Sequence, residues 1–271
     1  MRDLLARIVE RPAPIMANRV WALVNQIFNF AIEQDWLDTG NPATRITKQT
    51  ETSRDRVLTE DELRALWTAL ESCKTVTHTG EPGTGPVISP MIARGLQVLL
   101  LTAHRPGEVF KMRWQDVDLN AKWWTIPVEH SKNGQPHRVA LTDRALGLIK
   151  EARAASPKNN GRVFAGIAGG SVAARAKKAA AELERAGAIA FEFHRHDLRR
   201  TAATHMAAAG IARDTISHVL NHVDRGSRAT AVYERFSHDP EKRVALEAWD
   251  RRFETILAAK PAATVLAFAR A

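Results

Sequence analysis

A short β-rich stretch in an otherwise helical chain is the feature that most restricts the fold of this protein. Within residues 122–141, the run WWTI at 123–126 is rich in strand-forming residues, and HRV at 137–139 follows an Asn-Gly pair. An Asn-Gly pair between two such runs is typical of a β-hairpin. Most other segments place apolar residues at helical spacing. The sequence therefore predicts a mainly α-helical fold with a small antiparallel β-sheet, an α+β class.

The expected helices follow the apolar periodicity of the chain. Thr59 and Glu62 fit a capping box that begins a helix, and residues 88–103 are apolar enough to predict a buried one. A short helix is predicted from Arg105 through Trp114. Further helices are predicted at about 142–155, 171–187, 197–209 and 213–220, near Tyr233, and from about 240 to 258.

The first fifty residues are predicted to form one long helix followed by a turn. The helix has an apolar stripe that contains Val20, Val24, Ile27 and Ala31. One helix cannot bury such a stripe alone, so it either packs on the rest of the chain or belongs to a domain whose beginning is absent. Residues 45–57 are polar and charged, which predicts a linker.

Composition narrows the classes of function. The chain of 271 residues has 39 Lys and Arg against 30 Asp and Glu, a formal net charge of +9 that suggests a polyanionic partner. Its single cysteine, Cys73, excludes an intrachain disulfide framework and a multi-cysteine zinc site. The longest apolar run, at 98–101, is too short to span a membrane, and the N-terminus lacks the apolar stretch of a signal peptide. We therefore expect a soluble cytoplasmic protein with no membrane partner.

Several polar motifs carry chemically useful side chains, although each also has an ordinary structural interpretation. Arg105 and Glu108 in LTAHRPGEV fit a surface ion pair as well as a buried site. Lys132 in SKNGQPHRV lies at the predicted hairpin tip, where a lysine is usually solvated. His196 and Arg199 in FHRHDLRRTAATHM are three positions apart and share one face of a helix.

Two further side chains lie near the C-terminus. His222 belongs to VLNHV, and Tyr233, the only tyrosine of the chain, follows eleven positions later. Taken alone, a single tyrosine is usually a packing residue or a surface hydroxyl. A metal site at His194 and His196 is disfavoured, because no cysteine is near and the adjacent charges are arginines.

The ordered set of Arg, Lys, His-x-x-Arg, His and Tyr resembles the active site of the tyrosine recombinases, the phage integrase family. LTAHRPGEV, SKNGQPHRVAL, HDLRRTAAT and VLNH…VY each match the local context as well. The resemblance implies a tyrosine recombinase catalytic domain at 58–258. It also implies a truncated, C-terminal part of a helical core DNA-binding domain at 1–44, a linker at 45–57 and a C-terminal tail at 259–271.

The resemblance implies a role for each residue of the set. Tyr233 is the nucleophile, which attacks the scissile DNA phosphate to give a 3′-phosphotyrosyl link and a free 5′-hydroxyl. Arg105 and Arg199 hold the phosphate oxygens, where planar bidentate donors suit developing charge. The ester stores the bond energy, so no ATP, metal or organic cofactor is implied.

The other members of the set assist this step. Lys132 protonates the departing 5′-oxygen, His196 transfers a proton, and His222 donates a hydrogen bond to the phosphate. Glu108 supports the site electrostatically. Many family members separate the last His and the Tyr by nine positions, and the spacing of eleven here marks a subgroup.

The function that this resemblance implies is site-specific DNA recombination by an integrase. The partners are double-stranded DNA attachment sites and three further copies in a homotetramer on DNA, in a nucleoid-associated setting. An accessory DNA-bending or excision factor stays open. One alternative is a catalytically idle DNA-binding prophage remnant. Another, a type IB topoisomerase, ranks lower because the local motifs follow integrases.

Overall fold

The computed structural model describes residues 2–11, 14–44, 46–51, 54–75, 87–131, 133–155, 161–165, 172–222 and 237–259. The chain divides into two compact units, Met1–Arg54 and Asp55–Ala271. Lys132, Tyr233 with the helix predicted near it, and nearly all of the predicted tail lie outside the described residues. In the described part, no helix combines the length and apolar character that a membrane span requires.

The N-terminal unit contains two helices where one was predicted, α1 (Arg2–Val9) and α2 (Pro14–Glu33). In the sequence, Pro12 and Pro14 lie between the end of α1 and the first turn of α2. A proline lacks the N–H that a helix interior requires, so it begins a helix more readily than it continues one. Part of the predicted linker lies along α2. There Asn18 Nδ2 donates to the Gln49 carbonyl at 2.8 Å, and Gln49 N donates to Asn18 Oδ1 at 2.8 Å.

A buried helix, α4 (Pro90–Thr102), forms the centre of the C-terminal unit, as its apolar sequence predicts. Ser89 caps it by accepting a hydrogen bond from Met91 N at 3.3 Å. Around it pack α3 (Glu60–Thr75), α6 (Asp143–Ala155) and α9 (Arg195–Ala208). The α4 backbone comes so close to Phe110 that a Cβ at Gly95 would lie 2.2 Å from its ring.

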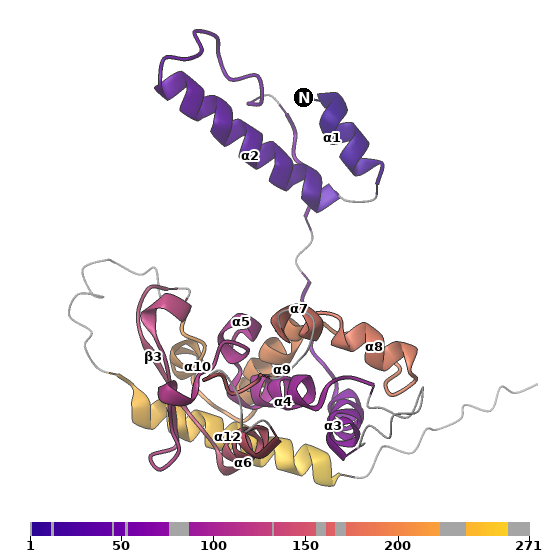
Figure 1. The fold of residues 1–271 in the computed structure, drawn as a ribbon, viewed down its shortest axis with the longest axis vertical. Helices are drawn as coiled ribbons and strands as arrows, with labels where there is room; N and C mark the ends of the chain where they lie inside the picture. Colours follow the sequence, from indigo (N-terminus) through magenta and orange to yellow (C-terminus); the bar gives the residue numbers. More distant parts are fainter. Residues whose placement is uncertain are drawn as a thin grey trace, which may run out of the picture. The chain divides into compact units, whose positions relative to one another are not determined.

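The capping box predicted for the start of α3 is confirmed. Glu62 N donates to Thr59 Oγ1 at 3.2 Å, and Thr59 N donates to Glu62 Oε2 at 2.9 Å. The long helix α12 (Asp239–Ala258), yellow in Figure 1, packs against α3, α4, α9 and α10 (Arg213–Val219) and reaches the sheet at β3. One helix thus spans the unit from the sheet to α3.

The sheet has three antiparallel strands in the order β1-β2-β3. They are β1 (Val117–Asp118), β2 (Trp123–Ile126) and β3 (His137–Ala140), with 3-10 turns η1 (Trp114–Asp116) and η2 (Val128–His130) beside them. Trp123 lies opposite Ala140, and Ile126 lies opposite His137. The predicted class, mainly helical with a small antiparallel sheet, is confirmed.

Two predicted helices differ from the observed ones. The helix after Arg105 is the four-residue α5 (Pro106–Val109), which ends before Trp114. The helix predicted at 171–187 is divided into α7 (Val172–Ala176) and α8 (Ala179–Arg185). Between them, Lys177 and Lys178 donate to carbonyls three residues earlier, which tightens the chain and interrupts the α-helical pattern.

Candidate active site

Arg105 lies where α4 ends and α5 begins. Ala103, directly after α4, takes a left-handed conformation with φ 56°, and Arg105 is the N-cap of α5. The Arg105 guanidinium donates through Nη1 to Glu108 Oε1 at 2.9 Å, and the Arg105 backbone N donates to Oε2 at 3.0 Å. Glu108 is 3% exposed. The pair is therefore part of a buried site and not a surface ion pair.

Arg199 comes from α9 and is held by main-chain oxygens. Its Nη1 donates to the Ala103 carbonyl at 2.8 Å, and its Nη2 donates to the Leu220 carbonyl at 2.5 Å. Nη2 also lies 3.2 Å from His222 Nε2. In the described part of the chain, none of the groups bonded to this buried guanidinium is a carboxylate. Arg199 therefore brings a positive charge into the protein without a directly bonded countercharge.

Asn221 connects Arg105 to the hairpin that carries Lys132. Its carbonyl accepts hydrogen bonds from Arg105 Nη2 at 3.5 Å and from Asn133 Nδ2 at 2.5 Å. Its side-chain Nδ2 donates to Ser131 Oγ at 3.3 Å. Ser131 and Asn133 are the sequence neighbours of Lys132. The two flanks of the predicted general acid are thus hydrogen-bonded to a residue that also contacts Arg105.

Asn221 is a residue that the sequence motifs did not single out. It takes a left-handed conformation with φ 49°, which asparagine adopts more readily than most residues. Its place directly before His222 in VLNHV is the only signal in the sequence that could have identified it. The conformation turns the chain so that successive residues 220–222 each face the site.

The two histidines predicted for the site differ in their contacts. His196 is exposed in the first turn of α9, and desolvation together with Arg199 and Arg195 lowers its pKa below the ordinary value. His196 is therefore neutral at neutral pH. A guanidinium has only donors, so His222 Nε2 is the acceptor of the Arg199 contact and the ring carries its proton on Nδ1.

Two buried histidines, His104 and His137, lie behind the arginines with ring centroids 5.2 Å apart. Burial, followed by Lys242 and the two arginines, lowers the pKa of His137 to about 3. Burial and His137 also lower the pKa of His104 well below its ordinary value. Both rings are neutral near pH 7, so they add no positive charge to the site. Arg105 and Arg199 carry positive charge into the site.

Four of the seven predicted site residues form two contacting pairs, Arg105 with Glu108 and Arg199 with His222. The adjacent carbonyls of Leu220 and Asn221, bonded to Arg199 and Arg105, join the two pairs. His196 joins them electrostatically, because both arginines lower its pKa. Lys132 and Tyr233 lie outside the described residues. Two guanidinium groups with neutral imidazoles suit an anion such as a phosphate. The described residues include no group of three His, Cys, Asp or Glu side chains arranged to hold a metal ion.

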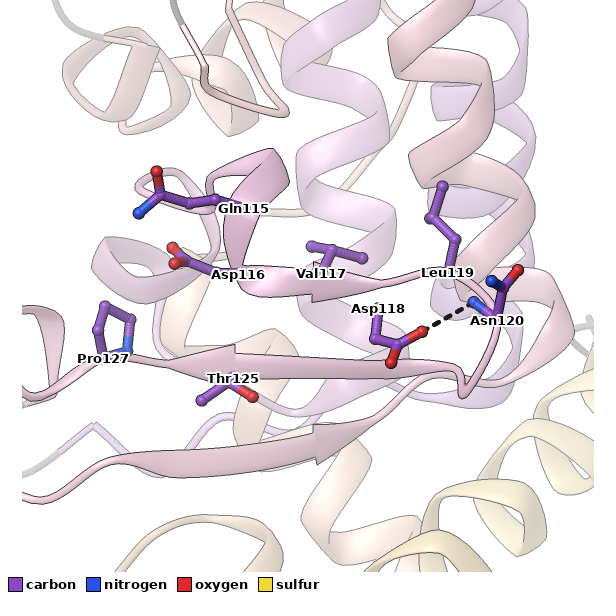
Figure 2. Close-up of a pocket in the computed structure, with 8 residues that line it drawn as sticks. All are labelled: Gln115, Asp116, Val117, Asp118, Leu119, Asn120, Thr125 and Pro127. Atoms are coloured by element: carbon purple, nitrogen blue, oxygen red, sulfur yellow. Dashed lines mark hydrogen bonds between the residues drawn. The ribbon is translucent and has the colours of Figure 1, made fainter.

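A separate hollow lies beside the sheet and is lined by residues of η1, β1 and the turn after it, together with Thr125 of β2 and Pro127 (Figure 2). It measures about 660 Å³, and none of the predicted site residues lines it. Its carboxylates have partners already. Asp116 pairs with Arg113 Nε at 2.9 Å, and Asp118 Oδ1 accepts hydrogen bonds from the backbone N of Asn120 and Ala121. An acidic lining disfavours a phosphate, so this hollow is distinct from the candidate active site.

Comparison with known sequences places the site in a family context. The sequence pattern of the phage integrase family matches residues 56–238. Prophage integrase IntA of Escherichia coli (strain K12) is 31% identical over 152 residues, which cover 55% of this chain and 36% of IntA. Prophage integrase IntZ of the same organism is 26% identical over 265 residues, which cover 95% of this chain and 60% of IntZ. This chain thus spans less than two thirds of the length of either relative.

Solved structures share the fold. A lambda integrase dimer bound to a COC′ core site matches with a TM-score of 0.56 at 18% identity, over 82% of this chain and 77% of that one. The Tn1549 transposon integrase in complex with transposon right end DNA matches with a TM-score of 0.59 at 14% identity, over 90% of this chain and 82% of that one. At such low identity the likeness concerns the fold, and it agrees with the predicted class.

Proposed function

Because the chain belongs to the phage integrase family, we propose that it is a site-specific DNA recombinase that cleaves and rejoins strands through a 3′-phosphotyrosyl intermediate. The observation that supports this most strongly is the convergence of both arginines on residues 220–222. Leu220 and Asn221 bind the guanidinium groups through their carbonyls, and His222 lies against Arg199. A DNA phosphodiester is the anion that such a site would bind in a recombinase.

The arginine pair supplies the electrostatic part of the mechanism. Each guanidinium has five N–H donors, so it can keep its protein contacts and still donate to a non-bridging phosphate oxygen. Arg105 and Arg199 are preorganised by carbonyl and carboxylate acceptors, and therefore need little rearrangement as charge develops on the phosphate. Glu108 holds Arg105 in place and does not react.

The nucleophile in this proposal is Tyr233. Its phenolate oxygen forms a bond to phosphorus while the bond to the 5′-oxygen breaks, which leaves a 3′-phosphotyrosyl ester. A phenol has an ordinary pKa of about 10, so its proton must leave during the attack. His196 is the proposed acceptor, since a neutral imidazole at neutral pH can take up that proton.

Lys132 is the proposed acid for the leaving 5′-oxygen. The contacts of its two neighbours with Asn221 support a place for the hairpin beside the arginines. A 5′-phosphorothiolate substrate tests this role, because its sulfur leaving group needs no acid. We expect Lys132→Ala to lose cleavage of ordinary DNA and to regain at least part of it on the phosphorothiolate. Absence of any rescue would remove Lys132 from the role.

The proposed partner is double-stranded DNA that carries attachment sites. The solved lambda integrase structures include a dimer bound to a core site and a tetramer bound to a Holliday junction. By analogy, we propose a homotetramer on two duplexes, with residues 58–258 as the catalytic domain. Residues 1–44 are proposed to contribute the second DNA contact, as part of a core-binding domain.

Covalent trapping tests the function. Nicked duplexes that carry the DNA flanking the gene are incubated with the wild-type protein and with Tyr233→Phe, and then separated under denaturing conditions. We expect a shifted band with the wild-type protein alone. DNA binding without any covalent band would contradict the proposed recombinase activity. It would favour the alternative, a DNA-binding protein that does not cleave DNA.

A further inference from the structure

Two stacked histidines lie on either side of the segment 223–236, which contains Tyr233. His218 is in the last turn of α10, and His238 directly precedes α12. Their ring centroids are 3.8 Å apart and their planes differ by 12°, so the two rings lie face to face. Both residues are partly buried. The stack therefore joins the chain shortly before this segment to the chain shortly after it.

On one side, His218 is continuous with the residues that hold the arginines. Asn221 N donates to the His218 carbonyl at 3.1 Å. Two and three residues after His218, the carbonyls of Leu220 and Asn221 accept hydrogen bonds from Arg199 and Arg105. A displacement of His218 would therefore reach the arginine pair through one short stretch of backbone.

On the other side, His238 fixes the start of α12. It has a left-handed conformation with φ 50° and ψ 27°, and its carbonyl accepts a hydrogen bond from Lys242 N at 2.9 Å. The next residue, Asp239, is buried and pairs with Arg138 of β3 and with Lys242 Nζ, the latter at 2.8 Å. His238 is thus held by the stack on α10 while its neighbour is held by the sheet.

We propose that His218 and His238 are a positioning pair for Tyr233. Tyr233 precedes His238 by five residues, and five residues of extended chain reach at most about 18 Å. Fixing His238 against α10 therefore limits where the phenol can lie relative to Arg105 and Arg199. The purpose of this pair rests on the proposed function, whereas its effect on the surroundings of residue 233 can be measured without any reaction.

The left-handed backbone of His238 offers a competing explanation, which is that the residue merely permits the chain to turn. Side-chain choice separates the two explanations. His238→Asn tolerates a positive φ but loses the stacked ring. His218, in a helix, can lose its ring as His218→Ala or keep a flat ring as His218→Phe. A turn-only role predicts that His238→Asn and His218→Ala both behave like the wild type.

The single tyrosine of the chain allows a direct measurement. Incorporation of 3-fluorotyrosine places one fluorine in the protein, at position 233, and the fluorine NMR resonance reports the surroundings of that ring. We expect His218→Ala and His238→Asn to shift this resonance, and His218→Phe to retain the wild-type position. An unchanged resonance in both ring-free variants would overturn the proposal, whether or not the protein cleaves DNA.

His205→Ala is the matched control. His205 stacks on Trp249 with ring centroids 5.4 Å apart and an interplanar angle of 23°, so its loss removes a ring contact between α9 and α12. Trp249 lies eleven residues after His238, so this contact is away from the two ends of the segment 223–236. We expect this variant to keep the fluorine resonance of the wild type. A shift as large as that of His218→Ala would mean that any lost ring contact disturbs residue 233, and would also overturn the proposal.

Cleavage gives the second readout. With saturating nicked DNA, we expect His218→Ala and His238→Asn to form the covalent adduct about 10- to 100-fold more slowly, because small misplacements of reacting groups have effects of this size. DNA affinity should be unchanged, and His218→Phe should restore the rate. Unchanged rates in both ring-free variants would overturn the positioning role. If the wild type itself forms no adduct, the proposed function fails, and the fluorine resonance still decides whether the pair positions residue 233.

Discussion

The two arginines of the candidate site, Arg105 and Arg199, differ in the groups that accept their hydrogen bonds. Around Arg105, the buried carboxylate of Glu108 supplies both a countercharge and two acceptor oxygens. Around Arg199, the acceptors are the Ala103 and Leu220 carbonyls and the His222 ring. Carbonyl oxygens satisfy N–H donors but do not neutralise a charge. Of the two regions, the one around Arg199 is therefore the better prepared to receive an anion.

Electrostatics supports this distinction. Burial, followed by the neighbouring Arg105, lowers the pKa of Arg199 to about 10. The group is still protonated at neutral pH, but its charged form is held in an unfavourable environment. A phosphate bound at this point would relieve that cost, whereas Arg105 already has a carboxylate. The site thus combines an arginine that has its own countercharge with one that has none directly bonded among the described residues.

The largest expected effect follows from removing Arg199. We expect Arg199→Ala to slow covalent adduct formation about 10³-fold and Arg105→Ala about 10²-fold, within the range for loss of a transition-state donor. Single-turnover trapping on nicked DNA measures both rates. Arg200→Ala is the control, because Arg200 pairs with Asp197 at 3.2 Å and, of the site residues that the structure describes, contacts none. Equal rate losses for Arg105→Ala and Arg199→Ala would contradict the claim that the region around Arg199 is the better prepared to receive an anion.

The countercharge is tested by Glu108→Gln, which keeps the size and one of the two acceptor oxygens but removes the charge. We expect adduct formation about tenfold slower and an unfolding free energy lower by about 1–3 kcal/mol, since a buried hydrogen bond to a charged group is weakened. Trapping and urea denaturation measure the two effects.

The matched control for that change is Glu62→Gln. Glu62 forms the same kind of capping box at α3, beside Arg56 and away from the site. It is less buried than Glu108, so we expect a stability loss below about 1 kcal/mol and no change in adduct formation. If both variants slowed adduct formation equally, the special role of Glu108 would be contradicted.

Local chemistry made much of the fold predictable from the sequence. The apolar run of α4, the Thr59–Glu62 box and the β-rich runs each show their structure within a few residues, and all three are confirmed. The extra helix break before Pro14 was missed, because the apolar stripe outweighed the prolines in the prediction. Periodicity reports which face is buried more reliably than where a helix is interrupted.

The sequence singles out candidate members of the site but not the contacts that connect them. Motifs identify Arg105, Glu108, Lys132, His196, Arg199, His222 and Tyr233, and the roles assigned to these residues stay predictions. Asn221 was missed because its role depends on contacts with Asn133 and Arg105, which are 88 and 116 positions away in the chain. Contacts over such separations leave no periodic or local signal in one sequence.

A smaller effect, on the free energy of unfolding, is expected from protonation of His137. His137 is buried and faces Lys242, Arg199, Arg105 and His104, and burial is the main reason that its pKa falls from 6.5 to about 3. Between these two values the unfolded chain binds more protons than the folded one, so stability is lost as the pH falls. At pH 5, His137 alone should lower the unfolding free energy by about 2 kcal/mol relative to neutral pH.

Urea denaturation at pH 7 and pH 5 measures this loss, and His137→Gln is the informative variant. We expect the wild type to lose more stability on acidification than the variant, because glutamine does not titrate. An identical loss in the two proteins would show that protonation of buried His137 is not costly in this region. The comparison between the two arginine regions would then be weakened.

The smallest expected effect concerns Asn221, where Arg105 meets the hairpin. Asn221→Gly keeps the left-handed conformation and the carbonyl but removes the amide that donates to Ser131 Oγ at 3.3 Å. Loss of one neutral hydrogen bond corresponds to adduct formation about two- to fivefold slower. Asn221→Ala loses the same amide and also adopts φ 49° at a further cost of about 1 kcal/mol, so it should be less stable than the glycine variant. If the glycine and alanine variants were equally stable and equally slow, the lost amide of Asn221, and not the strain of its left-handed backbone, would account for both effects.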